Sequence, residues 1–246
     1  MSLEWYKESF GKDYLLVYPH RNRAMANDEV ERLIDWLQLT EKDQILDLCC
    51  GTGRHSISLA KRNFNVLGLD LSWELLNIAT KMSQSEMLPI HFIHGDMRQL
   101  PFVDQSYDVV LNLFTSFGYF HEDQQNFQVL LEIARVLKSE GRFFIDFLNK
   151  EAIVSHLIPE SERQEKGMII KENRRIEGDY VCKNIRIVDG NEERRYEERV
   201  KMYTYHQLLS MIEEAGMTVN ATYGSYQGEP YTKESERMII IGTVYK

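Results

Sequence analysis

The chain has 246 residues, of which 43% are apolar and 27% charged, and its formal net charge is −9. This composition is typical of a globular protein with one full α/β domain and an appendage. The acidic balance disfavours nucleic acid as a partner, because phosphate-neutralising contacts supply nucleic-acid affinity. No apolar stretch approaches the roughly 20 residues that cross a bilayer, which predicts no membrane partner. The three cysteines show no metal-ligand spacing and the N-terminus no signal-peptide pattern, so we expect a cytoplasmic protein without a metal.

Residues 1–40 are expected to form a helical cap. Apolar residues recur at helical spacing after Asn27, a candidate N-cap. They are Val30, Leu33, Ile34 and Leu37. An aromatic-rich lead that includes Trp5 and Tyr14 precedes them.

The segment 41–150 is expected to form the core, because apolar strands alternate with helices. Strands are predicted at residues 45–49, 64–70, 90–94, 107–114 and 142–147. Helices are predicted to begin near residues 54, 73 and 123. This alternation predicts a parallel sheet with right-handed crossovers.

The pattern changes after Asn149. Residues 151–203 are expected to form an antiparallel insertion of three strands, which would serve as a lid or a dimer contact. The three strands are predicted at residues 168–174, 180–188 and 194–203. A helix from Thr204 and two strands, near 217–226 and 237–245, are expected to complete the core within 204–246.

The segment from Ile45 to Ser72 indicates a nucleoside site. A strand containing Asp47 leads into the turn Gly51-Thr52-Gly53, and after a helix a second strand ends at Asp70. Glycines let the backbone approach a ligand closely, and a carboxylate at the second strand end can accept both ribose hydroxyls. We therefore expect a βαβ unit that binds a nucleoside.

Two features of this unit disfavour a dinucleotide. The third glycine of the G-x-G-x-x-G pattern is missing, because Ser56 stands in its place. Asp47 would repel a pyrophosphate but would attract a ligand with an ammonium group. S-adenosylmethionine carries an ammonium and a sulfonium and no phosphate, so it fits this pattern better than NAD.

At this point the chain resembles the class I S-adenosylmethionine-dependent methyltransferases. The matching motifs are DLCCGTG (47–53), LDLS (69–72), HGDMRQLPF (94–102) and YDVVLNLFTSFGYF (107–120). The terminal segments FGKDYLLVYPHR and YGSYQGEPYTKESERMIIIG extend the likeness to a widespread bacterial group that acts on small molecules. The resemblance implies a Rossmann-like seven-stranded sheet with helices on both faces.

The resemblance also implies the residues that hold the cofactor, S-adenosylmethionine. Asp47 would bind the ammonium, Asp70 the ribose and Asp96 the adenine amino group. Backbone and side-chain contacts to the rest of the cofactor would come from Gly51, Gly53, Leu71, Met97 and Leu113. Arg21 would bind the carboxylate if the N-terminal segment folds over the cofactor. The family commonly has glycine where this chain has Cys49, which would line the methionine end.

The sequence indicates the residues of the acceptor site less specifically than those of the cofactor site. The run from Phe114 to Phe120 is broken by small residues, so part of it is expected to be loop and part core. Tyr119 and His121 are the candidate catalytic residues. Phe117, Glu229 and Tyr231 are candidates for the acceptor site.

Three residues beside the glycine turn also have structural interpretations that require no function. A solvated position at the helix start is at least as good an interpretation of His55 as a ligand role. Cys49 and Cys50 are most simply small thiols at a strand end, since no second cysteine lies at C-x-x-C spacing.

These observations together predict methyl transfer to a small molecule, with a preference for a nitrogen acceptor. The alternatives are a non-catalytic binder of S-adenosylmethionine or S-adenosylhomocysteine, and an NAD-dependent oxidoreductase. The expected partner is the small-molecule acceptor, and the protein is expected to be a monomer or a homodimer.

Overall fold

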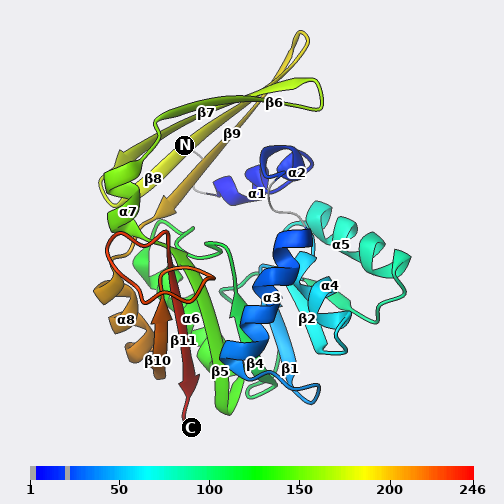
Figure 1. Ribbon diagram of the computed structural model, residues 1–246, viewed down its shortest axis with the longest axis vertical. Helices are drawn as coiled ribbons and strands as arrows, with labels where there is room; N and C mark the ends of the chain where they lie inside the picture. Colours follow the sequence, from blue (N-terminus) through cyan, green and yellow to red (C-terminus); the bar gives the residue numbers. More distant parts are fainter. Residues whose placement is uncertain (1–3, 20–22) are drawn as a thin grey trace.

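The computed structural model describes residues 4–19 and 23–246. Its core is a seven-stranded sheet in the order β3-β2-β1-β4-β5-β11-β10 (Figure 1). The strands are β1 (Gln44–Leu48), β2 (Asn65–Asp70), β3 (His91–His94), β4 (Tyr107–Asn112), β5 (Leu137–Leu148), β10 (Met217–Tyr223) and β11 (Arg237–Val244). β11 runs antiparallel to its neighbours β5 and β10, whereas β1 to β5 pair in parallel. The predicted seven-stranded sheet is confirmed.

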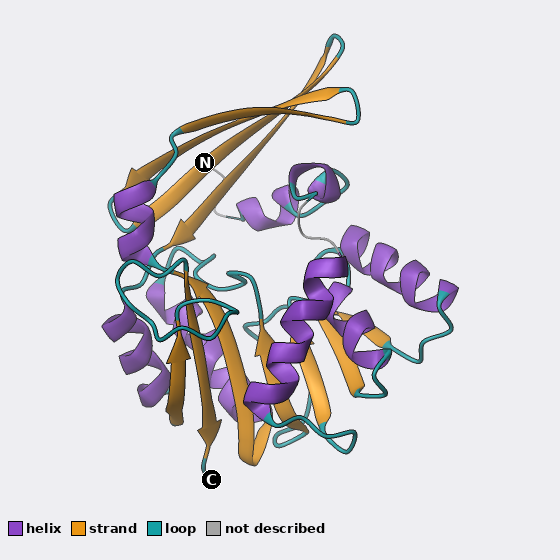
Figure 2. Ribbon diagram, in the orientation of Figure 1, coloured by secondary structure: helices purple, strands orange, loops and turns teal. Residues whose placement is uncertain are grey.

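Helices cover both faces of this sheet (Figure 2). They are α3 (Arg23–Leu37), α4 (Arg54–Ala60), α5 (Trp73–Ser85), α6 (Asp123–Val136) and α8 (Tyr205–Glu214). The short helix α7 (Lys150–His156) lies where the chain passes from the core to the insertion. α3 begins before Asn27, so that residue is not the N-cap. Within the described residues, no helix has the length and apolar character to span a membrane.

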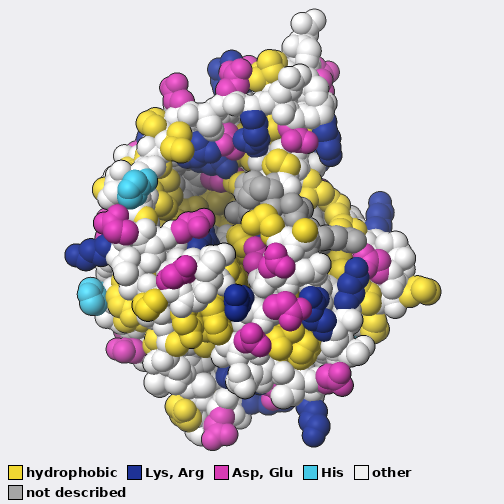
Figure 3. Space-filling view, viewed as in Figure 1, with side chains coloured by type: hydrophobic (Ala, Val, Ile, Leu, Met, Phe, Trp, Pro, Cys, Tyr) yellow, Lys and Arg dark blue, Asp and Glu magenta, His cyan; other side chains and the backbone are white. Residues whose placement is uncertain are grey.

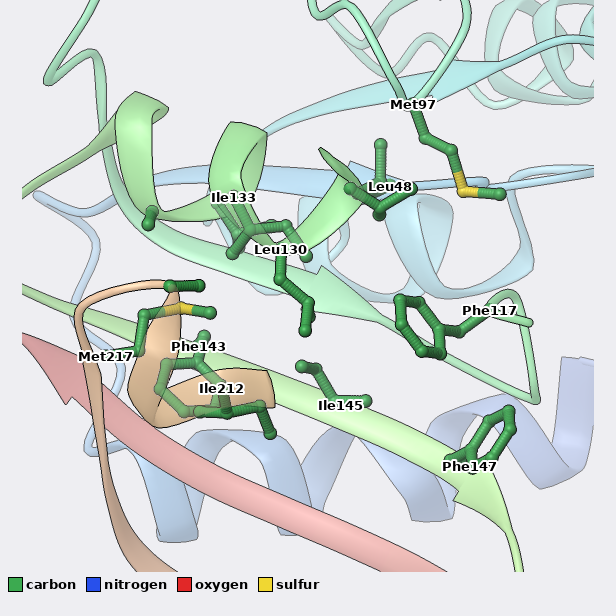
Figure 4. Packing of buried hydrophobic residues seen from close by; sticks show 14 of the residues in the cluster. Leu48, Met97, Phe117, Leu130, Ile133, Phe143, Ile145, Phe147, Ile212 and Met217 are labelled. Atoms are coloured by element: carbon green, nitrogen blue, oxygen red, sulfur yellow. The ribbon is translucent and has the colours of Figure 1, made fainter. Parts of the chain in front are cut away.

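The core consists of two apolar clusters, one on each face of the sheet. Successive side chains of a strand point to opposite faces. Leu46 and Ile145 accordingly pack with α6 and α8 residues in one cluster, and Ile45 and Phe144 pack with α3 in the other. Figure 4 shows part of the first cluster, between the sheet, α6 and α8.

The insertion is a separate four-stranded antiparallel sheet above the core (Figure 1). Its strands are β6 (Glu160–Glu165), β7 (Met168–Glu177), β8 (Tyr180–Asp189) and β9 (Glu192–Lys201). The predicted count of three strands was wrong, because β6 was missed. The sequence of β6, ESERQE, has no apolar residue and low strand propensity, and it forms a strand only by pairing with β7.

The first two helices, α1 (Trp5–Ser9) and α2 (Tyr14–Val17), pack on the insertion sheet. Leu16 and Val17 form one apolar cluster with Ile170, Ile185 and Ile187 of that sheet. We call residues 4–18 the N-terminal cap. The cap and the insertion sheet together lie over the carboxyl ends of the core strands (Figure 1).

Candidate functional site

The principal cavity lies at the carboxyl ends of β1, β2 and β3 and has a volume of about 410 Å³. Its lining includes Cys49, Gly51, Asp70, Leu71, Asp96, Met97 and Tyr119. Sequence motifs far apart in the chain thus meet in one cavity. In open α/β sheets, ligands bind in this position.

Asp70 ends β2 beside the glycine turn. Its Oδ2 accepts a hydrogen bond from the backbone N–H of Gly51 at 2.8 Å, and its Oδ1 accepts one from Ser72 N–H at 2.8 Å. Burial raises the pKa of this carboxyl, and the two backbone hydrogen bonds oppose the shift. A carboxylate offers about four lone-pair sites, so Asp70 can accept further bonds from ligand hydroxyls.

Asp96 lines the cavity just after β3. Partial burial disfavours its charged form, but Arg98 donates to both carboxylate oxygens and the pKa ends below its usual value. The guanidinium of Arg98 also lies 4.3 Å from the ring centroid of Phe120. Asp96 therefore presents an ionised acceptor next to an apolar wall.

Aromatic side chains of the N-terminal cap close the cavity from above. Tyr6, Phe10 and Tyr14 all line it. The Tyr119 ring, from the loop after β4, lies 5.0 Å from the Trp5 ring and 5.5 Å from the Phe10 ring. These cap residues were missed as site residues, although their aromatic spacing is visible in the sequence.

A second, small cavity of about 40 Å³ adjoins the principal one. The two share Tyr14, Cys49, Gly51 and Ser116 in their linings. Asp47 and Leu113 also line the small cavity, and Asp47 is only 1% exposed. Its Oδ2 accepts a hydrogen bond from Ser56 Oγ at 2.5 Å. Burial raises the Asp47 pKa, although His55, Ser56 and Arg54 oppose the shift.

Behind the small cavity, Glu29 of α3 holds Arg54 and His55. Its Oε2 accepts from Arg54 Nη1 at 2.9 Å and lies 2.7 Å from His55 Nε2. Burial, and then the charge of Arg54, lower the pKa of His55, so its ring is held neutral. The solvated position considered for His55 was wrong, because the residue is 4% exposed. No sequence pattern linked α3 to the glycine turn.

The glycine turn has a left-handed backbone at three positions. Cys49 has φ +61°, Gly51 +56° and Gly53 +71°. A Cβ on Gly53 would lie 2.8 Å from the Phe92 ring, so this glycine permits the close packing of α4 on β3. Gly53 lines neither cavity. Cys49 and Cys50 are free thiols, and Cys49 Sγ lies 3.5 Å from Met97 Sδ.

The loop after β4 is strained and firmly held. Phe114 and Thr115 have φ +54° and +64°. Asp146, buried at the end of β5, accepts from Phe114 N–H at 3.0 Å through Oδ2 and from Thr115 N–H at 2.8 Å through its backbone carbonyl. Arg237 donates to Asp146 Oδ1 at 2.7 Å and to Thr115 Oγ1 at 2.9 Å. This network places Ser116 and Tyr119 at the cavity.

The remaining candidates lie away from both cavities. Phe117 is buried against Phe147 in the core (Figure 4). The His121 ring is exposed and bonds to Glu122 at 2.9 Å. Glu229 is exposed and bonds to Ser225. None of these three lines the principal or the small cavity.

Tyr231 lies apart from the other candidates for the acceptor site. The Tyr231 ring stacks on Tyr205 at 4.6 Å, and its hydroxyl donates to Asn149 Oδ1 at 3.1 Å. It lies outside both cavities, in the loop beside α7 and α8. Arg21 lies outside the residues that the structure describes.

The hollow between the insertion sheet and the core contains hydrophobic side chains and has basic side chains at its edge (Figure 3).

Comparison with known proteins identifies the central segment. Residues 45–141 match the family model for "Methyltransferase domain". The "Putative methyltransferase YqeM" of Bacillus subtilis (strain 168) is 35% identical over 143 residues, which cover 57% of each chain. This match spans little more than half of that relative's length.

Two relatives match over more of the chain at lower identity. The "Cypemycin N-terminal methyltransferase" of Streptomyces sp is 26% identical over 80% of this chain and 81% of that protein. The "Glycine/sarcosine N-methyltransferase" of Aphanothece halophytica is 26% identical over 83% of this chain and 77% of that protein.

Solved structures share the fold over nearly the whole chain. An S-adenosylmethionine-dependent methyltransferase from Clostridium acetobutylicum ATCC 824 superposes with a TM-score of 0.81 and 20% identity, and it covers 95% of this chain and 96% of its own. CalS10, an amino pentose methyltransferase from Micromonospora echinaspora solved with its cofactor, superposes with a TM-score of 0.69 and 19% identity over 94% and 96%. Coverage of this extent includes the insertion sheet as well as the core sheet.

Proposed function

We propose that this chain is a class I S-adenosylmethionine-dependent methyltransferase that transfers a methyl group to an amine of a small molecule. The observation that carries the proposal is the principal cavity, in which Asp70, Asp96 and the glycine turn converge. The assignment of individual residues to the donor and the choice of nitrogen are parts of this proposal.

The residues present fit S-adenosylmethionine. The cavity of about 410 Å³ is in the size range of small-molecule sites. Asp70 and Asp96 would accept bonds from the ribose and the adenine, and Met97 and Leu71 would pack on the base. Asp47 would bind the ammonium from the small cavity. A buried carboxylate in that position disfavours the pyrophosphate of NAD.

The protein's contribution to the reaction is proposed to be positioning and exclusion of water. S-adenosylmethionine supplies a methyl group that is already activated by the positive charge on sulfur. The aromatic faces of Tyr6, Phe10, Tyr14 and Tyr119 would stabilise positive charge in the cavity. Tyr119 would also orient the acceptor, and in-line alignment can supply much of the acceleration. His121 is a weaker catalytic candidate, because it lies outside both cavities.

The preference for nitrogen is supported by the broader matches. The relatives that cover about four-fifths of this chain include proteins named for an N-terminal and a glycine/sarcosine N-methyl transfer. A "Demethylmenaquinone methyltransferase" of Lactobacillus johnsonii (strain CNCM I-12250 / La1 / NCC 533) is 40% identical, but over only 43% of this chain. An amine acceptor has to lose one proton before it attacks, and solvent can accept that proton. A hydroxyl acceptor would instead need a general base in the protein.

The proposal is tested by calorimetry followed by turnover. We expect the protein to bind S-adenosylmethionine and not NAD, and to form S-adenosylhomocysteine with members of an amine panel. Binding of NAD without any response to S-adenosylmethionine would overturn the proposal. Binding of the donor without turnover on amine, hydroxyl or thiol panels would favour the non-catalytic binder.

The ribose role of Asp70 gives a residue-level check. We expect Asp70→Ala to weaken donor binding by at least about tenfold, because ligand hydroxyls lose a charged acceptor. Glu213→Ala is the control, since it removes an exposed carboxylate of α8 that lines neither cavity. An unchanged dissociation constant for Asp70→Ala would remove the ribose assignment.

A further inference from the structure

Arg54 is a buried cation in the lining of the small cavity. The residue is 8% exposed, and it shares this cavity with Asp47, Cys49 and Tyr14. A buried guanidinium is costly unless it is paired and hydrogen-bonded, so its position has a structural or a functional reason.

Two direct contacts fix the guanidinium of Arg54. Nη1 donates to Glu29 Oε2 at 2.9 Å, and the ring of Phe114 lies 4.1 Å from Cζ. His55 bonds to the same Glu29 oxygen at 2.7 Å, which fixes the carboxylate in turn. Phe114 itself belongs to the strained turn held by Asp146. The guanidinium therefore has little freedom to reorient.

Part of the hydrogen-bonding capacity of Arg54 is unused. Among the described residues, no partner is found for its Nε or Nη2, whereas Nη1 is bound to Glu29. A guanidinium has five N–H donors in a planar fork, and a carboxylate is the group that matches two of them at once. The free donors and the cavity together point to an anionic group.

The small cavity offers opposite charges to one ligand. Asp47 supplies a buried carboxylate and Arg54 a buried cation within about 40 Å³, which is room for a few heavy atoms. An α-amino acid group carries an ammonium and a carboxylate on one carbon, and it matches this pair in both sign and size. The cavity adjoins the principal cavity through Cys49, Gly51 and Ser116.

We infer that Arg54 binds the carboxylate of the methyl donor and selects donors with an intact amino acid group. Glu29 is a positioning residue that aims the guanidinium. This inference rests on the proposed function, because the amino acid group is that of S-adenosylmethionine. The carboxylate of the donor then binds Arg54, the first residue of α4, whereas the sequence alone predicted Arg21 as its partner.

The test measures binding of S-adenosylmethionine and of its decarboxylated analogue, S-adenosylmethioninamine, by calorimetry. The wild-type protein should prefer S-adenosylmethionine by at least about tenfold. In Arg54→Gln the affinity for S-adenosylmethionine should fall by at least about tenfold, while the affinity for the analogue changes less than about threefold. Arg54→Lys should give an intermediate loss, because it keeps the charge but not the fork.

Arg62→Gln is the matched control. Arg62 follows α4 and pairs with Glu31 of α3 at 2.6 Å, so its loss also breaks an ion pair between the two helices. It lies outside both cavities and should leave the two affinities unchanged. Circular dichroism establishes that each variant is folded.

The outcomes separate the two levels of the proposal. Equal wild-type affinity for the two donors overturns the Arg54 inference even if Arg54→Gln does not fold. An equal loss for both ligands in Arg54→Gln also overturns it, since that loss would reflect general damage. Failure of the wild type to bind either compound instead overturns the proposed function.

Discussion

At the scale of single residues, Cys49 occupies a position that suits glycine. Its φ of +61° costs about 1–2 kcal/mol for a residue with a Cβ. The resemblance to the family left this cysteine unexplained, and the left-handed backbone supplies the reason why glycine is common there.

This strain predicts an unusual order of stability. We expect Cys49→Gly to be more stable than Cys49→Ala by about 1 kcal/mol, because both lose the thiol but only glycine relieves the strain. At most positions alanine is the more stable of the two. Urea denaturation of both variants measures the difference, and an alanine variant equal to or above the glycine variant would refute it.

His55 predicts a pH dependence of stability. Burial, reinforced by the charge of Arg54, lowers the pKa of His55 in the folded protein below the ordinary 6.5. At pH values between the folded-state pKa and 6.5, the unfolded chain therefore binds more protons than the folded protein. The stabilisation is therefore complete above about pH 6.5 and is lost as the pH falls toward the folded-state pKa.

The measurement is the free energy of unfolding at pH 7.5 and pH 5.5. We expect wild type to lose more stability on acidification than His55→Gln, in which the titrating ring is absent and the amide can still bond to Glu29. Equal losses in the two proteins would show that His55 does not titrate in this way.

At the scale of elements, the loop after β4 depends on Asp146. This carboxylate is fully buried and binds Arg237, the Tyr226 hydroxyl at 3.1 Å and the Phe114 N–H. The strained turn at Phe114 and Thr115 persists because these bonds hold it.

Removal of Asp146 should show how strongly it is coupled to Arg237. We expect Asp146→Ala to lower the free energy of unfolding by about 3–5 kcal/mol, since Arg237 loses its buried counter-ion. The double variant Asp146→Ala, Arg237→Ala should be less destabilised than the sum of the two single variants. Strict additivity in urea denaturation would contradict the coupling.

Elements with a local sequence pattern could be predicted, whereas elements that depend on contacts with distant parts of the chain could not. Strands β4, β5 and β11 carry apolar runs, and Asp47, Asp70 and Asp96 belong to recognisable motifs, so their positions at one sheet edge were predictable. β6 has no apolar pattern and becomes a strand only through β7. Glu29 and Arg54 are 25 residues apart, and only the packing of α3 on α4 brings them together.

The aromatic run after β4 illustrates the same limit. Phe117 and Tyr119 are two residues apart, yet the first is buried in the core and the second lines the principal cavity. The left-handed turn at Phe114 and Thr115 decides which side chain points where. No local pattern predicts such a turn at two non-glycine residues.

At the scale of the whole molecule, the N-terminal cap is attached to the insertion sheet by polar bonds. Asp13 accepts from Arg194 Nε and from the Tyr196 hydroxyl, both at 2.7 Å. Tyr18 donates to Glu198 at 2.7 Å. Toward the core, by contrast, the cap offers mainly the aromatic rings that line the principal cavity.

We expect Asp13→Asn to loosen the cap and the sheet together. Loss of the two charge-assisted bonds should lower the free energy that holds the cap over the cavity by about 1.5 kcal/mol. Donor release, which requires the cap to move, should then be about tenfold faster. Hydrogen exchange should rise in α1, α2 and β9 but not in β1 or β4. Glu162→Gln is the control, because it breaks only the exposed pair with Lys171. Faster exchange confined to α2 would contradict a shared unit.

The attachment of the cap also has a consequence for biosynthesis. Ser9 of α1 donates to the carbonyl of Glu197 at 2.6 Å, across 188 residues of chain. A ribosome that adds about 5–20 residues per second needs roughly 10–40 s to make that intervening chain. The aromatic residues of α1 therefore leave the ribosome long before the strand on which they pack. The cap therefore cannot dock until β9 has been made, and its aromatic rings stay without their packing surface during that interval.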